Sequence, residues 1–114
     1  MFMTYISEFT MKLTVSPGDS GIYDLSLAPK GRKLKLKRTQ VYFPAGTEGE
    51  LEIAIKYGNM TIIPDSGVLT GDDMTYTSLK EFEFDSGSPL RIYYNNTNAT
   101  YSKTCYLAFT FEVV

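Results

Sequence analysis

Histidine and tryptophan are missing from the 114 residues of this chain, and cysteine occurs once, as Cys105. Because histidine is missing, the 114 residues contain neither a Ser–His nor a Cys–His nucleophilic pair, and no zinc site with imidazole ligands. A single cysteine excludes an internal disulfide, which fits a reducing compartment or a fold that needs no covalent cross-link. We therefore expect a protein that is not an enzyme and that uses no cofactor and no catalytic metal.

Long hydrophobic runs are missing as well, since no apolar stretch approaches the roughly 20 residues that a membrane-spanning helix needs. The start of the chain, Met1 to Tyr5, has neither the basic region nor the long apolar stretch of a secretory signal. The net charge is −2, whereas binding to nucleic-acid phosphates needs a basic surface. We expect no membrane partner, no nucleic-acid partner and no obvious secretion.

The composition is that of an ordinary globular protein, with 43% hydrophobic and 21% charged residues. A chain of this length can bury one hydrophobic core. No internal repeat or low-complexity stretch divides it. We therefore expect a single domain that spans residues 1–114.

The last stretch of the chain, Lys103 to Val114, has the clearest pattern. Apolar side chains occupy alternate positions, namely Cys105, Leu107, Phe109, Phe111 and Val113. Alternate side chains of an extended strand lie on one face, whereas a helix would scatter them. The pattern predicts a half-buried strand that needs a sheet around it and a second layer over it. On that inward face, Cys105 should be a small buried hydrophobe and not a reactive thiol.

Similar alternation between turn signals predicts about eight strands in all. The others cover residues 8–15, 22–27, 32–43, 51–57, 60–63, 74–79 with 81–85 as one kinked strand, and 90–94. Short strands at this regular spacing are typical of sandwiches and barrels. We predict an all-β, antiparallel two-sheet sandwich of the jelly-roll or Greek-key type, with immunoglobulin-like strand order as the alternative.

The third predicted strand changes face along its length. Leu34 and Leu36 share one face, whereas Val41 and Phe43 have the opposite parity. A strand changes face only through an extra residue, so we predict a β-bulge near residues 38–39. This bend is where we expect the strand to pass from one sheet to the other.

Two stretches carry charge of one sign at alternate positions. The basic ladder consists of Lys33, Lys35 and Lys37, and the acidic ladder of Glu81, Glu83 and Asp85. If the ladders are neighbours in one sheet they pair within the chain. If they are not, the basic face of one subunit can meet the acidic face of the next and build a homo-oligomer. The third alternative is two solvated faces that protect edge strands. We take these six residues as the candidate oligomer contact.

Tyrosine is frequent, with nine residues, and several gather near an Asn-rich loop tip. The candidate surface for a glycan or a protein partner consists of Tyr93, Tyr94, Asn95, Asn96 and Tyr101. Such side chains can stack on sugars and hydrogen-bond their hydroxyls, or form the centre of a protein interface. The alternative is that one tyrosine of the adjacent pair covers the edge of the core.

Acids also gather in the longest loop, where Asp65, Asp72 and Asp73 lie, with Asp19 or Asp85 as further oxygen donors. Calcium takes six to eight oxygen ligands, which loops at one end of a sandwich can supply. No EF-hand spacing is present, however, and Asp–Gly pairs are common in turns. We expect these acids to form turns and assign no metal ligand.

From Thr39 onward, turn-rich stretches alternate with strands. They are FPAGTEGEL at 43–51, IPDSG at 63–67, TGDD at 70–73 and GSPLRI at 87–92, followed by the Asn-rich tip and the aromatic last strand. In this style the chain resembles small jelly-roll structural proteins of bacterial and archaeal viruses. The resemblance implies a coat, decoration or tail component without catalytic residues, located in the virion or the cytoplasm. Secreted carbohydrate-binding sandwiches share much of this style.

We therefore predict a non-enzymatic structural protein, a virion component that oligomerises through its sandwich faces. Its partners would be itself and other particle proteins. The alternative function is a carbohydrate-binding β-sandwich module that holds a glycan at the Tyr- and Asn-rich loop end. A hydrolase that uses a pair of carboxylates is the third hypothesis.

Overall fold

The computed structural model describes residues 6–25, 28, 31–85 and 87–114. Over these residues the chain forms nine strands and no helix. The strands are β1 (Ile6–Val15), β2 (Ser20–Leu25), β3 (Lys33–Phe43), β4 (Leu51–Tyr57), β5 (Met60–Ile63), β6 (Met74–Ser78), β7 (Phe82–Asp85), β8 (Leu90–Asn96) and β9 (Lys103–Val113). The predicted end of the second strand, residues 26–27, lies outside the described residues.

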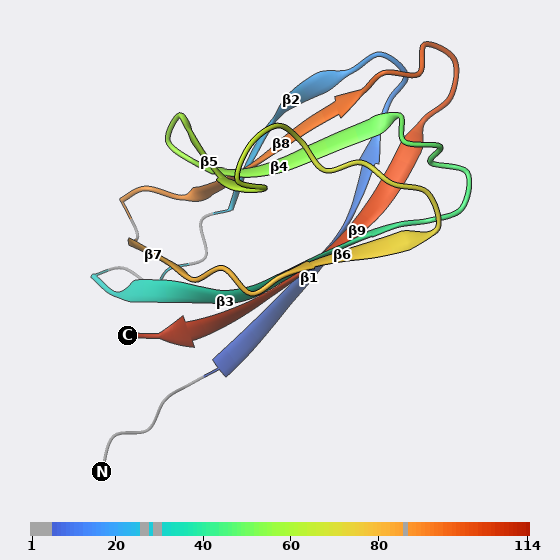
Figure 1. Cartoon of the computed structure of the whole chain (residues 1–114). Helices are drawn as coiled ribbons and strands as arrows, with labels where there is room; N and C mark the ends of the chain where they lie inside the picture. Colours follow the sequence, from blue (N-terminus) through green and yellow to red (C-terminus); the bar gives the residue numbers. More distant parts are fainter. Residues whose placement is uncertain (1–5, 26–27, 29–30, 86) are drawn as a thin grey trace.

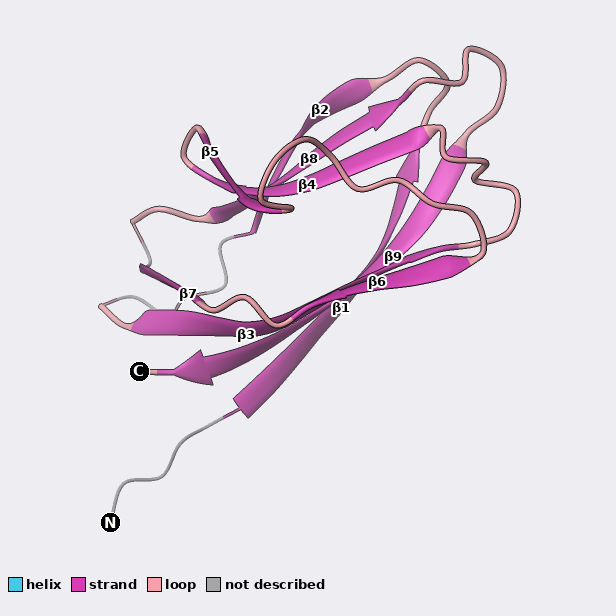
Figure 2. Ribbon diagram, in the orientation of Figure 1, coloured by secondary structure: helices cyan, strands magenta, loops and turns pink. Residues whose placement is uncertain are grey.

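Two antiparallel sheets face each other (Figures 1 and 2). The five-stranded sheet has the order β1-β9-β3-β6 with β7 also beside β3, and the four-stranded sheet has the order β2-β8-β4-β5. β1 pairs with β9, β2 with β8, β3 with β6 and β7, and β4 with β5. If β6 and β7 are taken as one interrupted strand, the first strand therefore pairs with the last, the second with the second-last, and the two middle strands form a hairpin. A long hairpin rolled up in this way is a jelly roll. The predicted two-sheet sandwich is confirmed.

The kinked strand and the bulge lie beside each other. Residues 33–36 of β3 pair with β7, and Thr39–Phe43 pair with β6, along the same edge. The register of β3 against β9 shifts between Leu36 and Arg38, so the predicted bulge is present with Lys37 as the extra residue. The predicted passage to the other sheet is wrong. A bulge changes the side-chain face and bends the strand without breaking the ladder, and β9 follows β3 on both sides of the shift.

The core lies between the sheets and confirms the face assignment of β9. Cys105, Leu107, Phe109 and Phe111 are all at most 2% exposed. Val113, at the end of the strand, is partly buried. The aromatic rings of Phe109 and Phe111 stack with their centroids 6.0 Å apart. Alternation in a single strand therefore identified one wall of the core correctly.

Candidate functional site

The two charged ladders are neighbours within one chain. In the register of β3 and β7, Lys33 lies opposite Asp85 and Lys35 opposite Glu83. Glu81, just before β7, accepts from two lysines: its carboxylate oxygens lie 3.3 Å from Lys35 Nζ and 2.5 Å from Lys37 Nζ. The lysines lower the pKa of Glu81, and the Glu81 carboxylate in turn raises the pKa of Lys37.

Lys37 also lies 3.6 Å from Glu112 of β9, so one charged patch covers three strands on the outer face of the larger sheet. Pairing within the chain is the first of the alternatives that the sequence left open. Lys35 and Lys37 form ion pairs with Glu81, and the remaining ladder residues lie opposite charges of the other sign within the same sheet. The oligomer contact at these six residues stays a prediction.

The Tyr- and Asn-rich residues do not form one exposed surface. Tyr93 and Tyr94 are adjacent in β8 and so point to opposite faces, and Tyr94 packs against the core. Asn96 is fully buried, and the Asn95 amide donates to Glu52 Oε1 at 2.9 Å. Tyr101 remains 68% exposed. Binding of a glycan at these residues therefore stays a prediction, with Asn96 unable to reach a ligand.

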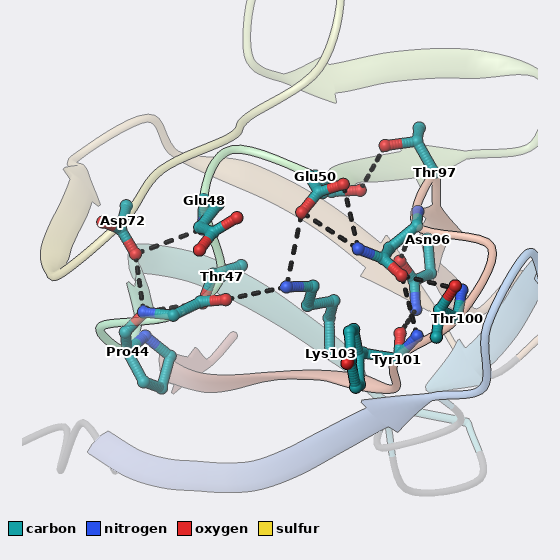
Figure 3. Close-up of polar contacts among 12 residues, drawn as sticks. Pro44, Thr47, Glu48, Glu50, Asp72, Asn96, Thr97, Thr100, Tyr101 and Lys103 are labelled. Carbon is teal, nitrogen blue, oxygen red and sulfur yellow. Dashed lines mark hydrogen bonds and ion pairs between the residues drawn. The ribbon is translucent and has the colours of Figure 1, made fainter.

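Polar side chains instead hold several loops together at one end of the sandwich (Figure 3). We call this cluster the loop tie, and its members are Glu50, Asp72, Asn96, Asn98 and Lys103. They come from the loop before β4, the loop before β6, and the tip between β8 and β9. Only Asn96 and Asp72 of this cluster were singled out from the sequence, for other roles.

Lys103 is the buried cation of the loop tie. It is the first residue of β9 and has the same parity as Cys105 and Leu107, so its side chain starts on the inward face. Its ammonium donates to the carbonyl oxygen of Gly46 at 2.8 Å and lies 3.4 Å from Glu50 Oε1. A charged residue at an inward position was the signal in the sequence that could have revealed this ion pair of a buried lysine.

Glu50 receives hydrogen bonds from two directions. The amide of Asn98 donates to Oε1 at 3.2 Å and to Oε2 at 3.1 Å. These bonds, followed by those of Lys103, lower the pKa of the Glu50 carboxyl against the opposing effect of burial. The backbone carbonyl of Glu50 accepts from the N–H and the hydroxyl of Thr97, each at 2.9 Å. One residue thus connects the loop before β4 to the tip after β8.

Asn96 connects the same tip to the turn after β1. Its amide nitrogen lies within hydrogen-bond distance of three carbonyl oxygens: those of Val15 at 3.1 Å, Ser16 at 3.3 Å and Tyr101 at 2.9 Å. Its side-chain oxygen accepts from the N–H of Asn98 at 2.9 Å. Every polar atom of the Asn96 side chain is therefore used inside the protein.

Asp72 shapes the loop before β4. Its Oδ1 accepts the backbone N–H groups of Gly46 at 2.8 Å and of Glu48 at 3.1 Å, and these bonds lower its pKa. They fix a turn in which Glu48 has a φ of 57° and Gly46 a φ of 98°. Positive φ is uncommon for a residue with a side chain, so the Asp72 contact compensates local strain. The expected role of this acid in turns is the one that it has here.

A second feature lies on the outer face of the five-stranded sheet. Tyr42 of β3 and Tyr106 of β9 stack with centroids 6.2 Å apart, and they are 38% and 43% exposed. They line an open hollow with polar neighbours that include Thr10, Lys12 and Gln40. A half-exposed aromatic pair beside hydrogen-bonding groups can bind a planar or sugar-like ligand.

The fold and the site together define a jelly-roll sandwich with a polar tie between the loops at one end. No family model and no curated protein matches the chain. Among solved structures, one match belongs to the work "Bacillus endospore appendages form a novel family of disulfide-linked pili", with 12% identity and a TM-score of 0.43 over 97% of this chain and 89% of that one. Another is a de novo designed double-stranded beta-helix, with 16% identity and a TM-score of 0.34 over 93% of this chain and 99% of that one. These TM-scores are too low for either similarity to carry an argument about function.

Proposed function

We propose that the chain is a non-enzymatic structural protein that assembles with copies of itself, as a component of a virion or a similar particle. The jelly roll alone does not decide this, because capsid and lectin domains both use it. The choice rests on how the chain uses its buried polar groups.

The observation that carries the proposal is that most of these groups bond to the backbone of loops. Among the described residues, four polar or charged side chains are buried: Thr39, Thr47, Asn96 and Lys103. Three of them bond to loop backbone: Asn96 and Lys103 in the loop tie, and Thr47, whose hydroxyl donates to the carbonyl of Pro44 at 2.6 Å. The hydroxyl of Thr39 has no partner among the described residues. Internal polar groups used in this way make loops rigid, which suits a subunit that presents a fixed surface to neighbours.

The test is the mass of the purified protein in solution over a wide range of concentration, by sedimentation velocity and light scattering. We expect a defined oligomer whose population rises with concentration, and ordered particles by negative-stain microscopy at the highest concentrations. A chain that stays monomeric throughout would contradict the proposal.

The second candidate function is binding of a glycan, and the stacked pair of Tyr42 and Tyr106 favours it. This pair lies on an open sheet face, away from the loop end where the sequence predicted such a site. Screening on a glycan array, followed by calorimetry, tests this function. Tyr106→Ala should abolish binding, whereas Tyr101→Ala, which removes an exposed tyrosine at the loop tip, should not.

A further inference from the structure

β1 is a long strand at the edge of the larger sheet, and one side of it has no partner strand among the described residues (Figure 2). It has ten residues and pairs with β9 in one unbroken register from Ile6 to Val15. It contains no proline and no bulge, two of the features that natural proteins use to protect an edge, although it carries the charged residues Glu8 and Lys12. Among the described residues no strand pairs with this outer edge, so backbone N–H and C=O groups face outward there in a regular row.

The inward side chains of β1 are also incompletely covered. Phe9, Met11 and Leu13 are only partly buried. Their neighbours across the pair with β9 are Phe109, Leu107 and Cys105, and each of these is at most 1% exposed. An apolar row thus lies beside an open strand edge. A further strand at this edge would satisfy the backbone and cover the row at the same time.

The charges of β1 indicate which strand can pair with its open edge. Its only charged residues are Glu8 and Lys12, and both lie on the outer face with Thr10 midway between them. When two β1 strands pair antiparallel about a two-fold axis, one residue must lie directly opposite its own copy. Only then does each residue whose N–H and C=O point toward the partner strand face a residue with the same orientation, as the hydrogen bonds require. With Thr10 at the centre, Glu8 of each copy lies opposite Lys12 of the other.

No other symmetric register pairs these charges. A centre at position 8 would place Glu8 opposite itself, and a centre at position 12 would do the same to Lys12, which is destabilising. In the register centred on Thr10, Phe9 also lies opposite Met11 of the second copy, on the inward side. The strand is therefore self-complementary in charge and in apolar contact.

We propose that two copies of the chain join edge to edge through β1, antiparallel and centred on Thr10, into one continuous sheet. The inference rests on the proposed function, to which it adds the interface between subunits. Glu8 remains available for this contact: its Oε1 lies 3.5 Å from Arg38, but its side chain is 65% exposed. We take a second copy of the chain as the partner at this edge because its own β1 carries both the acid and the lysine that the pairing needs.

Cross-linking through introduced cysteines tests the register. In the proposed dimer the two Thr10 Cα atoms lie about 4.5–5.5 Å apart, within the range of a disulfide. Thr10→Cys should therefore form a disulfide-linked dimer under mild oxidation. Thr14→Cys is the matched control, since it replaces the same residue type on the same face of the same strand. Its two copies would lie about 27 Å apart and should not cross-link. The native Cys105 is fully buried and does not contribute, provided that free thiols are alkylated during denaturation.

Charge reversal tests the pairing. Lys12→Glu places carboxylates opposite each other and should weaken self-association by about tenfold. The double variant Glu8→Lys/Lys12→Glu restores opposite charges across the interface and should recover the dimer. Melting temperature confirms that each variant is folded, which we expect because both positions are exposed.

The outcomes separate the interface from the function. Cross-linking of Thr10→Cys alone, with rescue by the double variant, supports the β1 interface. Equal cross-linking of both cysteine variants, or an oligomer unaffected by Lys12→Glu, overturns the interface and leaves the proposed assembly in place. A wild-type chain that is monomeric at every concentration overturns the proposed function and the interface together.

Discussion

The ammonium of Lys103 lies 3.4 Å from the carboxylate of Glu50, although the two residues are 53 positions apart in the chain and Lys103 begins on the inward face of β9. Lys103 is 8% exposed. A buried charge such as that of Lys103 is tolerated only when an ion partner and hydrogen bonds satisfy its polar atoms. Asn98 and the Gly46 carbonyl supply those bonds here. The stability of this end of the sandwich therefore depends on the whole loop tie and not on one contact.

Replacing Asn96 tests the centre of that tie. Asn96→Ala removes the donor of the buried hydrogen bond to the Val15 carbonyl and of the part-buried one to the Tyr101 carbonyl, and an unsatisfied buried group costs about 1–3 kcal/mol. We expect the free energy of unfolding, measured in urea, to fall by at least that amount. Asn95→Ala is the control, because Asn95 is only partly buried and bonds a single carboxylate. Equal effects of the two variants would contradict the role given to Asn96.

The loop tie also predicts the response to acid. The hydrogen bonds of Asn98 lower the pKa of Glu50 below its ordinary value of 4.5. A carboxyl whose pKa is lower in the folded state stabilises the fold above its unfolded pKa, and this contribution is lost as the pH falls through the folded pKa. The melting temperature should therefore drop on acidification below about pH 4.5.

Glu50→Gln isolates this contribution. The variant should melt at a lower temperature than the wild type at pH 7, and the difference should shrink as the pH falls below the ordinary pKa of the carboxyl. Asp65→Asn is the control, since Asp65 is an exposed acid outside the tie, and its pH profile should follow the wild type. A constant difference between Glu50→Gln and the wild type at every pH would exclude the proposed coupling.

Phe109 tests the core. It is fully buried on β9 between the sheets, so Phe109→Ala should lower the free energy of unfolding by about 3–5 kcal/mol. Tyr106→Ala, three positions earlier on the exposed face of the same strand, should have a much smaller effect. An unchanged melting temperature for Phe109→Ala would show that the face assignment of β9 is wrong.

The charged ladders predict a loss of stability without a change of mass. Lys33→Glu/Lys35→Glu places like charges opposite Asp85 and Glu83 in the pairing of β3 with β7. Each cross-strand pair contributes about 0.2–1 kcal/mol, so the melting temperature should fall modestly. Adding Glu83→Lys/Asp85→Lys should restore it only in part, because position 35 also faces Glu81 and Glu112. A change in oligomer mass with no change in melting would instead favour the contact between subunits.

Cys105 should be unreactive in the native protein. Burial raises the pKa of its thiol to about 12, so the thiolate that reacts with alkylating agents is scarce near neutral pH. Labelling should be slow under native conditions and fast in denaturant. Rapid labelling of the folded chain would place Cys105 at the surface.

The strands themselves were predictable because their signals are local. Alternation of side chains predicted the buried face of β9, and the change of parity between Leu36 and Val41 predicted the bulge of β3. Each signal lies within a few neighbouring residues, where the extended backbone decides which way a side chain points. No knowledge of the partner strand is needed for either.

The partners were decided only by the way in which the chain rolls up. Whether the lysine ladder meets the acidic ladder depends on β7 lying beside β3. The same holds for Glu50 and Lys103, which meet because the loop before β4 and the start of β9 lie at one end of the sandwich. A polar side chain in a sequence carries its donors and acceptors but not their partners. Asn96 therefore resembled an exposed ligand-binding residue until the jelly roll placed three carbonyl oxygens around it.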